Sequence, residues 1–255
     1  MMDYFYSGHL LLDGKHYDQM HRDADWDLSF WSGQANNYGD PVLELACGTG
    51  RVANTLALEG FRVTGIDNSD TMLSEGRRKS ESQGTDVEWV QADVRYCELV
   101  TTFPLIIFPF RSIAALLAAK DLEACLSCVK KHLEPDGRFI IDAFNPDLDI
   151  LRHSPEERYS FAEYPDPEGN GTIVVTHSNE YDAASQINRI KLFFKLPSQT
   201  EVVIEELNLR MYFPQELDAL LEYNGFVIED KFGDYEETPF VSSTELQLVV
   251  CSKRR

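Results

Sequence analysis

The chain has 255 residues, of which 43% are hydrophobic and 26% are charged, a composition typical of a globular protein. Twenty-three basic residues stand against 43 acidic ones, so the formal net charge is −20 at pH 7. A surface of that sign repels the phosphate backbone, so a nucleic-acid partner is disfavoured and a small neutral or cationic partner is favoured. Because a chain of this size buries roughly 70–75% of its unfolded surface, we expect stability without a metal or a disulfide.

Cysteine usage and apolar runs bear on the compartment. Five cysteines are an odd number, and their spacing matches no disulfide framework, which favours a reducing compartment. Residues 1–14 have neither a basic start nor a long apolar stretch, so we expect no signal peptide there. The most apolar run, 103–119, contains two prolines and an arginine, and it predicts a strand, a loop and a helix start rather than a membrane span. We therefore expect a cytoplasmic protein with no membrane partner.

The first half of the chain alternates between helical patterns and short apolar runs. Residues 15–38 are predicted to be helical, and Gly-Asp-Pro at 39–41 breaks that pattern. Strands separated by helices of 10–15 residues predict βαβ units on a parallel sheet. The predicted strands are 42–46, 61–66, 87–91, 105–108 and 138–144, and the predicted helices are 51–58, 69–82 and 120–133, the last one ended by a turn at 135–137.

After residue 146 the pattern changes to long runs rich in Val, Ile, Thr, Phe and Tyr. Three such runs, 172–181, 186–196 and 201–211, predict an antiparallel meander. Residues 214–223 are predicted to be helical and capped by Asn224-Gly225. A closing hairpin follows at 226–232 and 244–251. The sequence thus predicts an α/β domain that carries a β-rich insertion.

A glycine-rich turn joins the first predicted strand to the next helix, in the segment Leu43-Glu-Leu-Ala-Cys-Gly-Thr-Gly-Arg51. Glycines let backbone approach a ligand closely, and a helix N-terminus offers unpaired N–H groups. Taken alone, Gly48-x-Gly50-x-x-Ala53 also fits the dinucleotide-binding fingerprint, and a triplet of this kind can be only a tight turn between a strand and a helix.

Two acidic residues follow the next strands. Asp67 ends the second predicted strand, where a carboxylate can accept both hydroxyls of a ribose, and Asp93 ends the third, where it can reach an adenine amino group. The carboxyl ends of strands are where open α/β sheets bind ligands. In the alternative interpretation Asp67 caps the helix that starts at Ser69, and Asp93 stabilises a turn.

Four segments in order resemble the class I S-adenosylmethionine-dependent methyltransferases: 44–50, 63–67, 91–93 and 134–137. The resemblance extends over residues 42–144 and includes the closing segment 211–251. The insertion at 150–211 is similar to that of small-molecule members, including antibiotic-sugar N-methyltransferases. Ala46 stands where many members have glycine, and Pro104 stands where an aspartate is common.

The resemblance implies a fold and a reaction. The fold is a Rossmann-like, seven-stranded, mostly parallel sheet with helices on both faces, plus an antiparallel β-insertion. The reaction is transfer of a methyl group from S-adenosylmethionine to N or O of a small molecule. The implied segments are an N-terminal helical lid (1–40), a cofactor-binding core (41–146), a β-rich insertion on the substrate side (147–211), and a C-terminal helix with the closing hairpin (212–255). A homodimer is left open.

The resemblance also implies a cofactor site. Glu44 would support the turn and the cofactor's ammonium, and Asp67 would hold the ribose. Phe108 would lie near the sulfonium, and Tyr17 would contact the cofactor from the lid. The remaining residues of the implied site are Ala46, Gly48 and Gly50, whose backbone would contact the methionine portion, Cys47 and Arg51 of the same segment, and Asn68, Met72, Asp93 and Val94 around the adenine.

Methyl transfer is an in-line displacement, so a general base is needed only for an acceptor that is protonated at working pH. The sequence identifies no such base: the imidazoles of His16, His21, His153 and His177 titrate near neutrality but fit surface or core positions equally well. Arg111 and Ser112 are candidates for contact with substrate. No metal site is expected, because Cys125-x-x-Cys128 lacks a second pair and Asp23, Asp25 and Asp27 scatter around a helix, where we expect them on a solvated face.

Two other functions remain open at this point. A nicotinamide-dependent oxidoreductase would share the glycine-rich turn and Asp67, but would not account for Glu44, Asp93 or the β-rich insertion. A non-catalytic module that binds S-adenosylmethionine or a partner would account for the missing base, because fold does not imply function.

Overall fold

The computed structural model describes residues 10–197 and 201–254, and its contacts divide the chain into two units. The core unit consists of residues 25–146 and 212 onward, and the insertion unit consists of 147–211 with the described part of 1–24. The start of the expected N-terminal segment (1–9) and residues 198–199 of the expected break lie outside the described residues. In the part of the chain that the structure describes, no helix combines the length and apolarity needed to cross a membrane.

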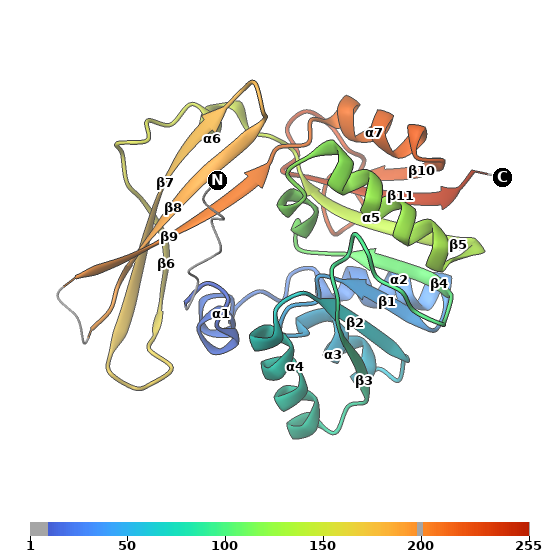
Figure 1. The fold of residues 1–255 in the computed structure, drawn as a ribbon, viewed down its shortest axis with the longest axis horizontal. Coiled ribbons are helices and arrows are strands. Elements are labelled where there is room, and N and C mark those ends of the chain that lie inside the picture. The colour runs from blue at the N-terminus through green and yellow to red at the C-terminus, as the bar shows by residue number, and fades with distance from the viewer. Residues whose placement is uncertain (1–9, 198–200, 255) are drawn as a thin grey trace. The chain divides into compact units, whose positions relative to one another are not determined.

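The core unit is built on a seven-stranded sheet in the order β10-β11-β5-β4-β1-β2-β3 (Figure 1). Strands β1 to β5 pair in parallel, whereas β10 and β11 form an antiparallel hairpin whose strand β11 pairs antiparallel with β5. This arrangement confirms the expected fold class. The strands are β1 (Val42–Leu45), β2 (Val63–Asp67), β3 (Val87–Gln91), β4 (Phe103–Phe108), β5 (Leu133–Phe144), β10 (Phe226–Phe232) and β11 (Leu246–Lys253).

Helices cover both faces of this sheet because its central strands are apolar on both sides. In β4, Ile106 packs into one buried cluster with α5 and α7, while Leu105 and Ile107 pack into another with α2 and α3. Continuous apolar runs of this kind are typical of parallel strands buried on both faces. The helices of the core unit are α2 (Leu28–Tyr38), α3 (Arg51–Leu58), α4 (Asp70–Gln83), α5 (Ala119–His132) and α7 (Pro214–Tyr223), with a short 3-10 turn at Ser112–Ala115.

Two local predictions in the core differ from the structure. The single helix expected over 15–38 is wrong: α1 (Gly14–Met20) and α2 are separate, and α1 belongs to the insertion unit. The turn expected at 135–137 lies inside β5, where the register jumps from the pair Phe103↔Leu133 to the pair Leu105↔Arg138. The extra residues of β5 form a bulge, which the proline and glycine of this segment allow.

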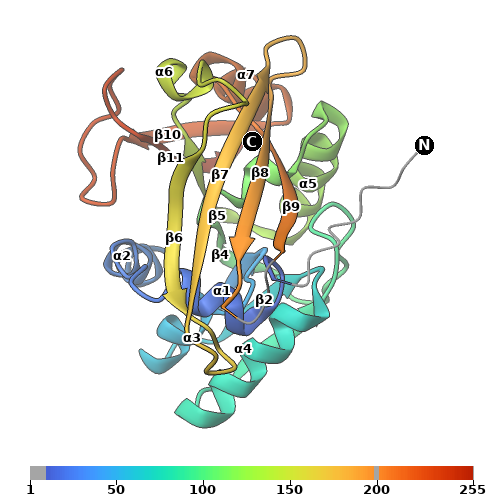
Figure 2. The ribbon, with the colours of Figure 1, turned by 90° about the vertical axis from the view of Figure 1, so that its left-hand side faces the viewer.

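The insertion unit contains a four-stranded antiparallel sheet in the order β6-β7-β8-β9 (Figure 2). Its strands are β6 (Tyr159–Pro165), β7 (Thr172–Asp182), β8 (Ile187–Lys195) and β9 (Val202–Arg210), and the short helix α6 (Leu148–Leu151) precedes them. The last three strands match the predicted meander. Strand β6 was not predicted, because its register shifts between Ser160 and Ala162 and breaks the alternation by which strands are identified.

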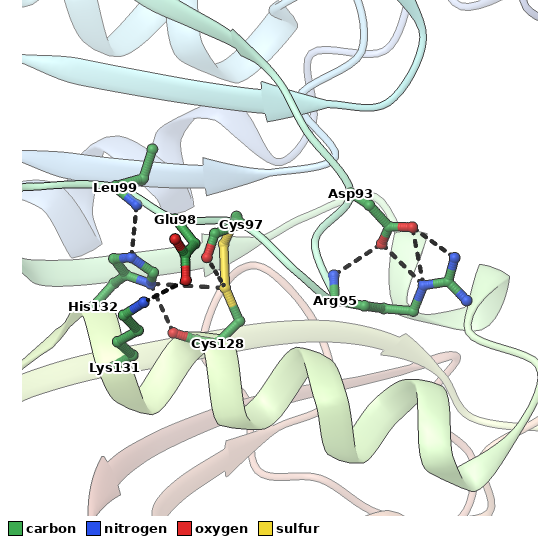
Figure 3. Close-up of a disulfide and its surroundings, with 8 residues drawn as sticks. All are labelled: Asp93, Arg95, Cys97, Glu98, Leu99, Cys128, Lys131 and His132. Atoms are coloured by element: carbon green, nitrogen blue, oxygen red, sulfur yellow. Dashed lines mark hydrogen bonds and ion pairs between the residues drawn. A yellow bond between two sulfur atoms is a disulfide. The ribbon is translucent and has the colours of Figure 1, made fainter.

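The structure contains a disulfide that the cysteine spacing did not indicate. Cys97, between β3 and β4, is bonded to Cys128 of α5 (Figure 3), while Cys47, Cys125 and Cys251 are free and buried. The irregular β3–β4 loop (residues 92–102) packs its cysteine against the helix across a separation of 31 residues, and such a contact leaves no spacing pattern in the sequence.

Candidate functional site

The residues that the sequence singles out converge at one edge of the core sheet. Strands β4, β1, β2 and β3 are neighbours and parallel, so their carboxyl ends meet along that edge. It carries the glycine-rich turn after β1, Asp67 at the end of β2, Asp93 after β3, and Arg111 after β4. Twelve of the thirteen residues implied for the cofactor belong to the core unit; the other is Tyr17, on α1 of the insertion unit.

The turn after β1 is built from left-handed backbone. Ala46, Gly48 and Gly50 have φ of 52°, 55° and 73°. Left-handed backbone costs a residue with a Cβ roughly 1–2 kcal/mol, which explains why glycine is common at the position of Ala46. At Gly50 a Cβ would also lie 2.1 Å from Cη2 of Trp89 on β3, so this glycine is required by packing as well as by φ. The turn brings its backbone N–H groups to the start of α3.

Asp67 holds the turns after β1 and β2 together. Its Oδ2 accepts the N–H of Gly48 at 2.9 Å, and its Oδ1 accepts the N–H of Ser69 at 2.8 Å. Burial raises the pKa of this carboxyl, and the backbone N–H groups of Ser69, Gly48 and Asn68 oppose that rise. The helix-cap alternative is therefore partly met, although Ser69 itself caps α4 through the N–H of Met72. Each carboxylate oxygen keeps a second lone pair for a ligand hydroxyl.

Glu44 is a carboxyl group enclosed within β1. It is 2% exposed, and burial raises its pKa to about 8, while the nearby charge of Arg51 and the N–H of Ala53 oppose the rise. Its Oε2 is buried without a hydrogen-bond partner. Such a group costs free energy unless something pairs with it, and a ligand ammonium would supply the missing partner. This buried, unpaired oxygen fits the ammonium of S-adenosylmethionine.

Arg51 is engaged by the protein rather than free for a ligand carboxylate. Its guanidinium binds Asp27, which is 0% exposed and also accepts the indole N–H of Trp31 at 2.9 Å. Its Cζ lies 4.9 Å from the ring centroid of Phe110. Arg51 thus joins the start of α2, the glycine-rich turn and the segment after β4. Asp27 was expected on a solvated face, and that expectation is wrong.

Asp93 is held by Arg95. Its Oδ2 accepts Nη2 of Arg95 at 2.6 Å, its Oδ1 accepts the backbone N–H of the same residue at 2.9 Å, and Arg95 also reaches Asp121 of α5 at 2.8 Å. The hydrogen bonds from the Arg95 side chain lower the pKa of Asp93. The turn alternative is therefore observed, and contact with an adenine stays a prediction.

The remaining residues of the implied site differ in exposure. Asn68 is exposed, whereas Met72 and Cys47 are buried, and burial raises the pKa of the Cys47 thiol well above its usual range. Phe108 is fully buried in the core. Val94 packs partly against that core, and Tyr17 contacts the ring of His21 within α1.

A pocket of about 580 Å³ opens in the core unit beside the segment after β4. Arg111 lines it, next to Trp26 and Tyr235, while Ser112 only begins the 3-10 turn. Asp142, fully buried at the end of β5, accepts the hydroxyl of Tyr235 at 2.7 Å and lies 4.0 Å from Nε of Arg111. Sequence reasoning did not identify Trp26, Tyr235 or Asp142. The other residues that line the pocket are Gly233, Asp234, Ser243, Thr244, Glu245 and Leu246.

The candidate base histidines all belong to the insertion unit. His16 is hydrogen-bonded to the hydroxyl of Tyr164 at 3.2 Å, and His153 stacks on Tyr159. Burial lowers the pKa of His177. The core unit has one described histidine, His132 of α5, which is buried with hydrogen bonds at both ring nitrogens.

Comparison with known proteins adds a family and a fold. Residues 42–137 match the family model described as a methyltransferase domain. A protein of Geobacillus sp. (strain WCH70) that is named as a methyltransferase is 31% identical over 132 residues, 49% of this chain and 53% of that protein. The chain therefore spans about half the length of that relative.

Solved structures share the architecture of the chain. The CcbJ methyltransferase from Streptomyces caelestis has a TM-score of 0.79 at 22% identity and covers 94% of this chain and 98% of its own. The sugar N-methyltransferase KedS8 from Streptoalloteichus sp. ATCC 53650 has a TM-score of 0.75 at 18% identity and covers 100% and 96%. At these identities the likeness establishes the fold.

Proposed function

We propose that the chain is a class I S-adenosylmethionine-dependent methyltransferase that methylates a small molecule, because residues 42–137 match a methyltransferase domain and solved methyltransferase structures share its fold. One observation supports this proposal above the others. Glu44 presents a buried carboxyl oxygen without a partner, one strand away from the carboxylate of Asp67. An ammonium and a ribose on one ligand would pair with both.

The core residues would hold S-adenosylmethionine as follows. Glu44 would bind the ammonium, the backbone of the glycine-rich turn would contact the methionine portion, and Asp67 would accept the ribose hydroxyls through its free lone pairs. Asp93 and Val94 lie at the adenine. Asp93 keeps acceptor capacity beside Arg95, because each of its oxygens has two lone pairs. The cofactor supplies a methyl group on a positively charged sulfur.

We further propose that the acceptor atom is an amine nitrogen, and that Arg111 and the pocket beside it receive the acceptor. An unprotonated amine attacks without a base, and the core unit offers no free imidazole among its described residues. The pocket has two carboxylates, Asp234 and Glu245, against the one guanidinium of Arg111, so it favours a neutral or cationic molecule. The sugar N-methyltransferase KedS8 shares this fold.

The experiment combines binding with turnover. Calorimetric titration with S-adenosylmethionine and with a nicotinamide dinucleotide separates the methyltransferase from an oxidoreductase. Incubation with methyl-labelled S-adenosylmethionine and matched pairs of amines and alcohols then identifies the acceptor atom. We expect S-adenosylmethionine to bind and the nicotinamide dinucleotide not to bind. We expect the labelled methyl group on the nitrogen of the amines and not on the alcohols. Binding without any transfer to either class would indicate a binding module and contradict the enzyme.

A further inference from the structure

The β3–β4 loop is attached to α5 at two places, which lie close together in the loop and on one helix. Arg95 of the loop binds Asp121 of α5 at 2.8 Å. Two residues further on, Cys97 is bonded to Cys128, two turns along the same helix (Figure 3). The same loop begins with Asp93, which the proposed function places at the adenine. We propose that Cys97 and Cys128 form a reversible thiol–disulfide switch that sets the affinity of the cofactor site, an inference that rests on the proposed function.

The surroundings of the pair favour a redox role over a metal site. Cys97, Cys128 and His132 place their ligand atoms within 4.8 Å of one another, a cluster that could hold a metal ion. The imidazole of His132, however, has no ring nitrogen with a lone pair available for a metal ion. Its Nε2 accepts the N–H of Leu99 at 2.9 Å, so its Nδ1 carries the proton and donates to the carbonyl of Cys128 at 2.8 Å. Two sulfurs remain, too few for a structural zinc site.

The linkage to Asp93 is short and contained in one unit. Asp93 owes its orientation to Arg95, whose guanidinium it shares with Asp121. With the disulfide closed, the loop has one position on α5, and Arg95 faces both carboxylates. With the disulfide open, no covalent bond holds the loop, and only non-covalent contacts remain, among them the ion pairs of Arg95 and the hydrogen bond from Leu99 to His132. These side chains are about one third exposed at Asp93 and Arg95, where ion pairs contribute little. The open form therefore presents Asp93 to a ligand less often.

The chemistry is ordinary thiol–disulfide exchange. The Cys97 or Cys128 thiolate attacks a low-molecular-weight disulfide and releases one small thiol; the second protein thiolate then displaces the other small thiol as the protein disulfide forms. Two protein thiols are oxidised and one small disulfide is reduced to two thiols. In a reducing compartment a disulfide is usually transient and redox-sensing, which suits the cytoplasmic location we expect. Because the cysteines are 5% and 7% exposed, exchange requires the loop to leave α5.

Thermodynamic linkage supplies the test. If the disulfide strengthens cofactor binding by some factor, bound cofactor must stabilise the disulfide by that same factor. The protein is equilibrated with glutathione buffers with and without saturating S-adenosylmethionine, and S-adenosylmethionine is titrated into the fully oxidised and fully reduced forms. We expect about three- to tenfold tighter binding to the oxidised form. The midpoint potential should then be lower by about 15–30 mV with cofactor, because tenfold corresponds to about 30 mV.

Variants give the controls. Cys97→Ala and Cys128→Ala should both bind S-adenosylmethionine like the reduced protein, whatever the buffer. Cys125→Ala changes the neighbouring free cysteine of α5 and should keep the redox response. Equal affinity of the oxidised and reduced forms would overturn the switch alone. So would five free thiols in oxidising buffer, or a stoichiometric zinc ion in the reduced protein. Binding in neither form would overturn the proposed function and the switch together.

Discussion

The carboxylate of Asp67 at the end of β2 accepts the backbone N–H of Gly48, in the turn after β1, at 2.9 Å. Its other oxygen accepts the N–H of Ser69. Both oxygens therefore face donors of the protein before any ligand arrives. The residue proposed to bind the ribose also fixes the turn proposed to bind the methionine portion, so the two halves of the cofactor site are mechanically coupled.

Replacing Asp67 by Asn should be costly despite the similar shape. An amide nitrogen must point at the N–H of Gly48 or of Ser69, so donor meets donor and one hydrogen bond is lost. We expect Asp67→Asn to lower the free energy of unfolding by about 1–3 kcal/mol. The neutral amide should also weaken S-adenosylhomocysteine binding, by less than the loss of about 10- to 150-fold expected for Asp67→Ala, which removes the charged hydrogen bonds to the ribose altogether. Urea unfolding and calorimetry measure both effects.

The control is Asp86→Asn, at an exposed position before β3. It should change neither the free energy of unfolding nor the dissociation constant. If Asp67→Asn binds S-adenosylhomocysteine as tightly as the wild type while remaining folded, Asp67 does not hold the ribose.

Gly50 and Gly84 offer a matched pair for separating backbone strain from packing. Their φ values are 73° and 69°, but a Cβ at Gly84 would meet nothing within 4 Å, whereas one at Gly50 would lie 2.1 Å from Cη2 of Trp89. We expect Gly84→Ala to cost about 1–2 kcal/mol of stability from strain. Gly50→Ala should cost about 1–3 kcal/mol more, from overpacking.

A second substitution tests the cause of that difference. Trp89→Leu in the Gly50→Ala protein should restore part of the lost stability in urea unfolding, because the smaller side chain makes room for the methyl group. Equal losses in Gly50→Ala and Gly84→Ala would show that Trp89 does not restrict the turn.

Much of the core could be predicted from the sequence because its determinants are local. Apolar runs bounded by turn residues identified β1 to β4, and the spacing of glycines in Glu44–Arg51 identified the turn that the structure shows after β1. Asp67 and Asp93 were found because the carboxyl ends of parallel strands share an edge. The alternatives of a helix cap and of a turn anticipated the contacts of Asp67 with Ser69 and of Asp93 within its turn. The hydrogen bond from Gly48 to Asp67 could not be predicted, because it depends on how the turns after β1 and β2 fold against each other.

Features that depend on distant partners were missed. Asp142 and Tyr235 are 93 residues apart and meet only when β5 and the segment after β10 are assembled. Cys97 and Cys128 meet because an irregular loop folds against a helix. The break between α1 and α2 was missed within 15–38. Asp27, just before α2, is fully buried and bound by Arg51, a distant contact that the local helical pattern does not indicate.

Glu44 should make cofactor binding depend on pH. Its pKa is raised to about 8 by burial, so it is protonated in the free protein near neutrality, and binding an ammonium requires its proton to leave. We expect affinity for S-adenosylhomocysteine to rise by up to about tenfold per pH unit between pH 5.5 and 7.5, below the pKa of an amino group near 8. Calorimetry in buffers of different ionisation enthalpy should detect about one released proton.

Glu44 should also make the free protein less stable as pH rises. Between its unfolded pKa near 4.5 and its folded pKa of about 8, the folded state binds the proton that the unfolded state has lost. The unfolding free energy therefore falls with pH across this window, by up to about 1.4 kcal/mol per unit. Glu44→Gln should remove both pH dependences while keeping the fold. If the variant binds with the same pH profile as the wild type, Glu44 does not pair with the ammonium.

Removing one partner of the buried ion pair Asp27–Arg51 should destabilise the protein more than replacing both partners by apolar residues. Arg51→Met leaves the carboxylate of Asp27 enclosed with only the indole of Trp31 as partner, and we expect a loss of about 3–5 kcal/mol of stability. The double variant Asp27→Leu/Arg51→Met removes both charges and should recover most of that loss, because burying an ion pair costs free energy that apolar side chains do not pay. A double-mutant cycle in urea measures the coupling. Additive losses would mean that the two charges do not stabilise each other in the folded protein.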